Sequence, residues 1–310
     1  MILTIRSSFC FVTLSIILST PCAVRANQAP RTSYDTPDLE GIWTNATSTP
    51  LQRPDELADI HSLSEEQLAS FKERVLEQYG DGGREAWFDL GLKPLTNGQI
   101  SLIIKPENGT IPWIEDTGEQ TSAAKNAGPN KPPISHHDFD TGERCITDGI
   151  ALYPQHPYNN NFQIFQTRNH IAIAQEMYHE YRIIPLDGRP FLEPPVEQWL
   201  GDSRGHWEGD TLVVISQGYA DRASWHWAKP WRAASASLRL TETFTRIDMK
   251  TIDYTFTIED PTRFSAPWTA RIPLTNDHEE RGVTSGDLYE FACHEGNYSI
   301  SRMLRMSTNP

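Results

Sequence analysis

The chain has 310 residues, of which 38% are hydrophobic, and its 41 acidic and 27 basic residues give a formal net charge of −14. This is the composition of a globular protein, and the length favours one large domain over two. An acidic surface repels phosphate, so we expect no nucleic acid among the partners.

The first 26 residues have the features of a secretory signal peptide. Arg6 precedes the apolar run Phe9–Leu18, and Val24-Arg25-Ala26 offers a cut near Ala26. The run is shorter than the roughly 20 residues that a membrane-spanning helix needs, so we expect no membrane anchor. We predict a periplasmic or secreted protein whose mature chain, residues 27–310, is a single domain.

Two cysteines, Cys145 and Cys293, remain once the signal peptide is removed. An even pair in an oxidising compartment usually forms a disulfide. We therefore predict a bridge between them, which would connect the start of the β-rich part to its last strand.

The predicted N-terminal part, residues 27–135, is rich in loops and contains one helix. Ser64 and Gln67 form a capping box at the start of the helical pattern Leu63–Tyr79. A short strand is expected at Ile100–Lys105. The rest of this part is expected to wrap around the β core.

The predicted β core, residues 136–310, consists of short alternating segments separated by turn residues. Glu208-Gly209-Asp210 is a turn signal between two such segments, and predicts a hairpin. The other expected strands are Asn161–Thr167, His170–Ile184, Leu238–Ile247, Thr251–Glu259, Trp268–Leu274 and Asp287–Cys293. Without strand–helix alternation, this pattern predicts a mainly β fold, an antiparallel barrel or half-barrel.

Two expected strands carry polar groups that could serve a site. In His170–Ile184, alternation places His179 on an apolar face with Ile171, Ile173, Met177, Tyr181 and Ile183, and places Tyr178 and Arg182 on the other face. Glu242 shares a face with Leu238, Leu240 and Phe244, so its carboxylate must be paired or neutral. Its partner would be Arg182, Arg204 or Arg271; alternatively, it lies in a ligand cavity and acts as an acid or base.

Gly41-Ile-Trp43, near the first expected strand, is similar to the Gly-x-Trp of lipocalins, in which the tryptophan plugs one end of the barrel. The whole mature chain also resembles a large, functionally uncharacterised family of exported bacterial proteins. This resemblance implies export and a single domain, and it implies no activity. The segments that carry it are 38–45, 50–54, 143–146, 158–160, 182–189, 199–214, 241–246, 260–261, 267–269 and 292–298.

Our leading hypothesis is a lipocalin-like barrel that binds a small, mostly apolar molecule. The residues expected to bind the ligand are Tyr178, Arg182, Trp207, Trp227 and Trp268, with Arg204, Glu242 and His179 as further polar anchors.

Two other functions remain open. One is a cofactor-free lyase, isomerase or hydrolase in the same cavity, with His179 or Glu242 as the base and Arg204 or Arg182 stabilising negative charge. The other is a scaffold without a ligand, which a solid barrel interior would favour. We assign no cofactor and no metal, although His136 and His137 form a cluster with Asp140 that could bind one. The sequence does not predict an oligomeric state.

Overall fold

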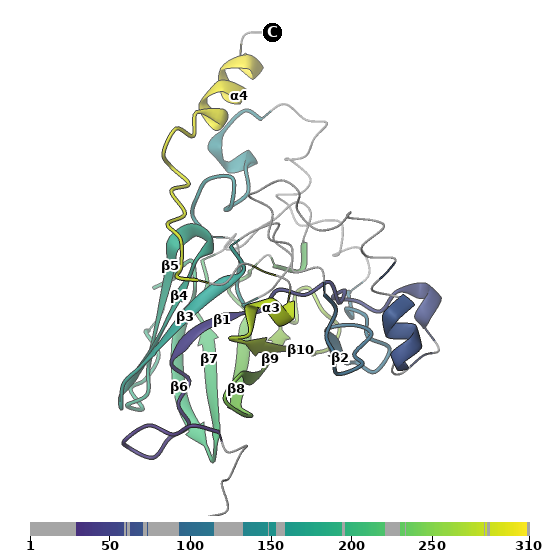
Figure 1. The fold of residues 1–310 in the computed structure, drawn as a ribbon. Coiled ribbons are helices and arrows are strands. Elements are labelled where there is room, and N and C mark those ends of the chain that lie inside the picture. Colours follow the sequence, from purple (N-terminus) through teal and green to yellow (C-terminus); the bar gives the residue numbers. More distant parts are fainter. Residues whose placement is uncertain are drawn as a thin grey trace, which may run out of the picture.

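The wall of the barrel is one continuous antiparallel sheet that curls until its two edges nearly meet (Figure 1). Along the sheet the strand order is β5-β4-β3-β1-β10-β9-β8-β7-β6, and β2 pairs with β10 beside this path. The strands are β1 (Gly41–Thr44), β2 (Ile103–Lys105), β3 (Asn161–Gln166), β4 (His170–Gln175), β5 (Glu180–Pro185), β6 (Asp202–Glu208), β7 (Thr211–Gln217), β8 (Arg239–Arg246), β9 (Thr251–Glu259) and β10 (Trp268–Thr275). The predicted lipocalin-like antiparallel barrel is confirmed.

The structure, a computed structural model, describes residues 29–58, 60, 63–70, 73, 93–114, 133–147, 149–152, 159–193, 196–220, 230–232, 234–281, 283 and 286–308. Its helical elements include η1 (Asp55–Leu57), η2 (His136–Asp138), η3 (Met177–His179), η4 (Pro230–Arg232), α3 (His278–Arg281) and α4 (Ser299–Thr308). In Figure 1, α4 projects away from the barrel at the C-terminal end. The predicted signal peptide lies outside the described residues.

Alternation along the strands fills the interior of the barrel. The inward side chains of β9, Ile252, Tyr254, Phe256 and Ile258, are all 0% exposed. Burying each apolar side chain of this size contributes about 1.5–3 kcal/mol. The outward positions carry threonines, and Thr243 and Thr255 are hydrogen-bonded through their hydroxyls across β8 and β9 at 2.7 Å.

Trp43 is fully buried and is held from two sides. Its indole Nε1 donates to the Leu39 carbonyl at 3.1 Å, and the Arg246 guanidinium lies 4.5 Å from its ring centroid. Arg246 also donates to the carbonyls of Asp248 and Met249 in the β8–β9 turn. Trp43 therefore packs inside the barrel beneath this turn, as the Gly-x-Trp pattern predicts.

The seam of the barrel lies between β5 and β6, the two ends of the strand order. Gly205 on β6 faces the end of β5, where a Cβ atom would lie 2.7 Å from Leu186 Cδ2 and 2.9 Å from Ile184 Cγ2. At this point of the seam, the side chains of Ile184 and Leu186 therefore pack directly against the glycine backbone of β6.

The predicted single strand over His170–Ile184 is wrong, because the chain reverses in its middle. Tyr178 and His179 adopt left-handed backbone conformations, with φ of 59° and 54°, and η3 connects β4 to β5. Ile171 and Ile173 point inward as predicted, but Tyr181 and Ile183 are 56% and 57% exposed. The turn reverses which side chains of the following strand point inward, so in β5 Arg182 points into the barrel while Tyr181 and Ile183 point outward.

The Cys145–Cys293 disulfide is present, with Cα atoms 5.6 Å apart. The predicted strand over Asp287–Cys293 is wrong: this segment is irregular and crosses the β4–β5 turn. There Glu176 accepts a hydrogen bond from the Tyr289 backbone N–H at 2.9 Å. The disulfide holds this C-terminal segment against the barrel.

The predicted capping box is also present. Ser64 and Gln67 exchange side chain–backbone hydrogen bonds of 2.9 and 3.2 Å, and residues 65–70 are helical. Much of the predicted helix beyond residue 70 lies outside the described residues.

Candidate functional site

A bidentate ion pair crosses the interior of the barrel between β5 and β8. The Nη1 atom of Arg182 lies 2.5 Å from Oε2 of Glu242, and Nη2 of Arg182 lies 2.9 Å from Oε1 of Glu242. The glutamate side chain is 0% exposed, whereas the arginine side chain is 11% exposed. Of the three arginines expected as partners of Glu242, Arg182 is thus the one that binds it, while Arg204 and Arg271 pair with Asp202 and Asp253.

Tyr254 on β9 completes the hydrogen bonding of Glu242. Its hydroxyl donates to Oε1 at 2.8 Å and accepts the backbone N–H of Leu152 at 3.2 Å. Burial raises the pKa of Tyr254 well above its ordinary value, and the neighbouring Glu242 charge adds to this effect. Burial alone would lower the pKa of Arg182, but the charge and hydrogen bonds of Glu242 raise it, so the guanidinium stays ionised.

A second tyrosine hydroxyl lies near this pair. Tyr219 is 0% exposed, and its hydroxyl has no hydrogen-bond partner among the described residues. Burial raises the pKa of Tyr219, the Arg182 charge opposes this and the Glu242 charge reinforces it, so the hydroxyl remains a neutral donor. Its ring packs against Gly201, where a Cβ atom would lie only 2.8 Å away.

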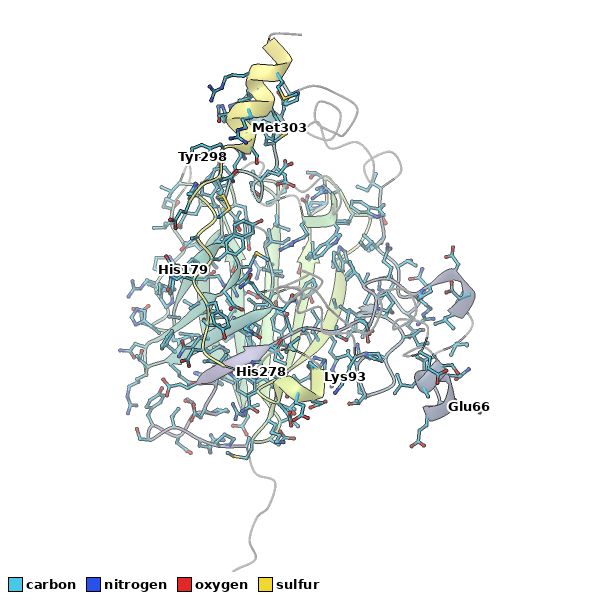
Figure 2. The ribbon with its side chains drawn as sticks, turned by 45° about the horizontal axis from the view of Figure 1, so that its top comes forward. Glu66, Lys93, His179, His278, Tyr298 and Met303 are labelled. Atoms are coloured by element: carbon cyan, nitrogen blue, oxygen red, sulfur yellow. A yellow bond between two sulfur atoms is a disulfide. The ribbon has the colours of Figure 1, made fainter. Side chains whose placement is uncertain are left out.

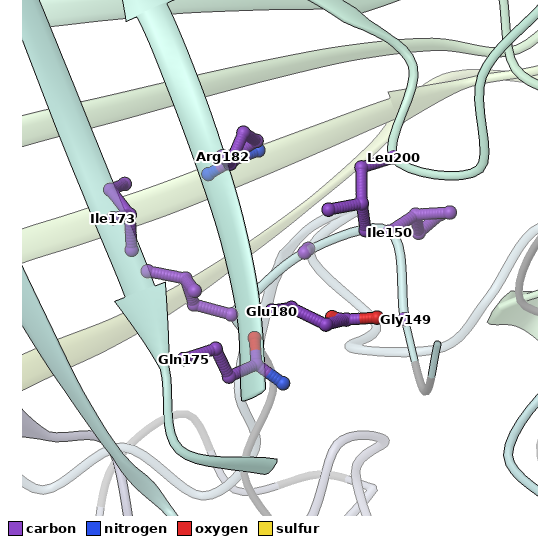
Figure 3. Close-up of a pocket in the computed structure, with 9 residues that line it drawn as sticks. Gly149, Ile150, Ile173, Gln175, Glu180, Arg182 and Leu200 are labelled. Atoms are coloured by element: carbon purple, nitrogen blue, oxygen red, sulfur yellow. The ribbon is translucent and has the colours of Figure 1, made fainter. Parts of the chain in front are cut away.

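The exposed edge of Arg182 opens into a pocket, which we call the barrel pocket (Figure 3). The hollow spans about 340 Å³ with open solvent included, and the centre of a water-sized atom can occupy about 20 Å³ of it, enough for one ordered water. Ile150 and Leu200 face the strands across it in Figure 3. Its lining residues are Gly149, Ile150, Ala151, Leu152, Ile173, Gln175, Glu180, Arg182 and Leu200.

Of the aromatic residues predicted to line the cavity, Trp207 and Trp268 do not line this pocket. Trp268 is 0% exposed and packs edge-on against Trp231 and Phe256, with ring centroids 5.5 and 5.8 Å apart. Its ring is thus part of the packed core. Trp207 is half-buried near the β6–β7 turn, and the predicted Trp227 lies outside the described residues.

Two predicted residues around the β4–β5 turn occupy other environments. His179 is exposed at the outside of the molecule (Figure 2), and its Nε2 lies 2.9 Å from the Tyr181 hydroxyl. Its predicted position on an apolar strand face is therefore wrong, since the turn carries it outward. Tyr178 packs edge-on against Phe291 of the C-terminal segment, with ring centroids 5.0 Å apart.

Arg204, the third predicted anchor, lies on the outer face of β6. Its guanidinium donates to the carbonyls of Arg189, Pro190 and Ser203 and forms an ion pair with Asp202. These contacts fix the segment after β5 to the barrel wall. Arg204 does not line the barrel pocket.

A larger hollow, which we call the outer groove, lies at the rim formed by β6, β7 and β8. The centre of a water-sized atom can occupy about 350 Å³ of it, against about 20 Å³ in the barrel pocket. The volume of the outer groove is within the range of small-molecule sites, about 300–1,000 Å³. A binding experiment must therefore distinguish it from the barrel pocket. Its lining residues are Phe191, Leu192, Val196, Glu197, Asp202, Gln217, Gly218, Tyr219, Ala236, Ser237, Leu238 and Arg239.

Sequence reasoning missed several groups around the ion pair and the barrel pocket. Tyr254 is the diagonal neighbour of Glu242, because β8 and β9 pair Phe244 with Tyr254 and Glu242 with Phe256, and only this register brings the two side chains together. Tyr219 and the segment 149–152 belong to no strand, so periodicity carries no signal for them.

Among the described residues, no group of three metal-ligating side chains is placed to hold an ion, and no helix has the length and apolar character to cross a membrane. Comparison of the chain with protein-family models, curated proteins and solved structures finds no match.

Proposed function

We propose that this protein binds a small molecule at the barrel pocket, with a polar head group against Arg182 and an apolar part against Ile150, Ile173 and Leu200. The observation that carries the proposal is the unequal burial of the ion pair. Glu242 is sealed in the interior, while Arg182 presents N–H groups to a pocket whose other walls are mainly apolar. A few placed polar groups within apolar walls are characteristic of small-molecule sites.

The proposal places this binding outside the cytoplasm. The signal-peptide pattern of residues 1–26 and the Cys145–Cys293 disulfide support this location. The net charge of −14 argues against nucleic acid as the ligand.

We do not extend the proposal to acid–base catalysis. Both oxygens of Glu242 accept hydrogen bonds and its side chain is 0% exposed, so it lacks access to a substrate proton. Neither His179 nor Arg204 lines the barrel pocket. Glu242 is better described as a positioning residue, which holds the guanidinium of Arg182 toward the pocket.

The test uses prodan, a neutral naphthalene fluorophore with one ketone group, whose emission depends on its surroundings. We expect saturable binding to the wild-type protein. An Arg182→Met variant should bind at least about tenfold more weakly, because it loses the donor in the pocket. The double variant Arg182→Met/Glu242→Leu, which leaves no unpaired buried charge, should show the same loss in a folded protein.

Two control variants locate the binding. Arg271→Met removes an arginine with a similar bidentate carboxylate pair on the outer face, and should leave prodan binding unchanged. Val196→Asp places a charge in the outer groove, where Val196 is 51% exposed, and should also have no effect. Loss of binding in Val196→Asp with retention in Arg182→Met would move the site to the outer groove and refute the proposal, as would the absence of saturable binding.

A further inference from the structure

We infer that the head group bound at Arg182 is a single neutral hydrogen-bond acceptor, such as a ketone or amide oxygen, and that carboxylates and phosphates are selected against. The inference rests on the proposed function and names the ligand class for the same pocket. Three independent properties of the pocket support it: its charge, its hydrogen-bond donors and its size.

The first property is charge. The guanidinium of Arg182 is already neutralised by the bidentate contact with Glu242, so the ion pair offers N–H groups without net positive charge. A second carboxylate entering the pocket would lose its hydration without gaining an uncompensated cation.

The second property is the balance of donors and acceptors. Each terminal nitrogen of Arg182 donates one hydrogen bond to Glu242, and a guanidinium has further N–H donors beyond these two. A ligand that brings an acceptor to these remaining N–H groups therefore completes the hydrogen bonding of Arg182.

The third property is size. The space that the centre of a water-sized atom can occupy in the pocket is about 20 Å³, enough for one such atom. A carbonyl oxygen fits this space. A carboxylate or phosphate presents more than one charged oxygen, and the remaining oxygens would lie against Ile150, Ile173 or Leu200 without hydrogen bonds.

The experiment compares three probes of equal chain length, hexanamide, hexanoate and hexylammonium, as competitors of bound prodan at neutral pH. We expect hexanamide to displace prodan at a concentration at least about tenfold lower than hexanoate does. Hexylammonium should also be weak, because it carries no acceptor for Arg182.

A second test uses Glu242→Gln, which neutralises the glutamate and leaves the charge of Arg182 uncompensated. We expect this variant to change the hexanoate-to-hexanamide affinity ratio by at least about tenfold in favour of hexanoate. Asp253→Asn is the matched control, because it removes the partner of Arg271 on the outer face, and its ratio should stay at the wild-type value. If Glu242→Gln does not fold, the comparison of hexanamide with hexanoate on the wild-type protein decides the charge argument by itself.

The outcomes separate the two proposals. Saturable prodan binding that requires Arg182, combined with tighter binding of hexanoate than of hexanamide, would overturn the ligand class and leave the proposed function intact. An unchanged affinity ratio in folded Glu242→Gln would overturn the charge argument. If prodan does not bind the wild-type protein, both proposals fail.

Discussion

Replacing Arg182 by methionine should destabilise the protein by about 3–5 kcal/mol, the usual cost of leaving a buried charge without its partner. Glu242 is 0% exposed, and the change removes two of its hydrogen bonds and keeps only the one from Tyr254. Arg271→Met is the matched comparison. The Arg271–Asp253 pair has the same bidentate geometry but is 42% and 22% exposed, so its loss should cost about 0–1 kcal/mol.

The double variant Arg182→Met/Glu242→Leu should be more stable than the single Arg182→Met variant. It leaves no buried charge, and its main remaining cost is the Tyr254 hydroxyl, which loses its acceptor, at about 1–3 kcal/mol.

Urea unfolding followed by tryptophan fluorescence measures these differences, with the slope of the transition used to check that the unfolded states are comparable. The reasoning is refuted if Arg182→Met costs no more than Arg271→Met. It is also refuted if the double variant is less stable than the single one, because the destabilisation would then come from lost packing and not from the unpaired charge.

Three further predictions concern parts of the molecule away from the barrel pocket. Replacing Cys145 and Cys293 by serine should lower the free energy of unfolding by about 2–5 kcal/mol in urea titrations, and an unchanged midpoint would contradict the structural role of the disulfide. Gly205→Val should cost at least about 1–3 kcal/mol, because even a Cβ atom would lie 2.7 Å from a β5-side leucine; a melting temperature equal to the wild type would refute close packing at the seam. Hydrogen bonds from the side chain and backbone of Arg189 lower the pKa of Asp187 to about 2. The stability that Asp187 contributes is therefore present above pH of about 4 and is lost as the pH falls toward 2, so Asp187→Asn should flatten the stability–pH curve there, and an identical curve would count against the contact.

The sequence predicts the regular part of the barrel well, because the signals for it are local. In Thr251–Glu259 every second side chain is apolar, and the observed β9 has these bounds. Gly209 lies at the predicted β6–β7 turn with φ of 60°, a conformation that glycine adopts without strain. The disulfide followed from the even cysteine count of the mature chain.

The β4–β5 turn escaped prediction because it contains none of the residues that usually mark a reversal. Tyr178 and His179 adopt positive φ there, and the surrounding contacts hold them, including the packing of Tyr178 against Phe291. One unrecognised turn was enough to assign Tyr181 and His179 to the wrong face.

The candidate site could be predicted only in part. Alternation placed Glu242 among apolar side chains and so required a partner, and Arg182 was among the arginines expected. The rest depends on the closure of the sheet, which brings Leu152 and Tyr219 from irregular segments to the ion pair. No local pattern in the sequence predicts these contacts of Leu152 and Tyr219.

The shortest strand of the barrel path has a consequence for the order of assembly. Among the described strands, β1, with four residues, links the β3–β5 group to the β6–β10 group, because it pairs with β3 on one side and with β10 on the other. Its register joins Thr44 to Asn161 and to Thr275, both more than 100 residues further along the chain. Contacts between residues so distant in sequence form slowly, since the chain between them must first be ordered. The barrel is thus completed by a strand that is synthesised first and is fully paired only after nearly all the rest of the chain has emerged.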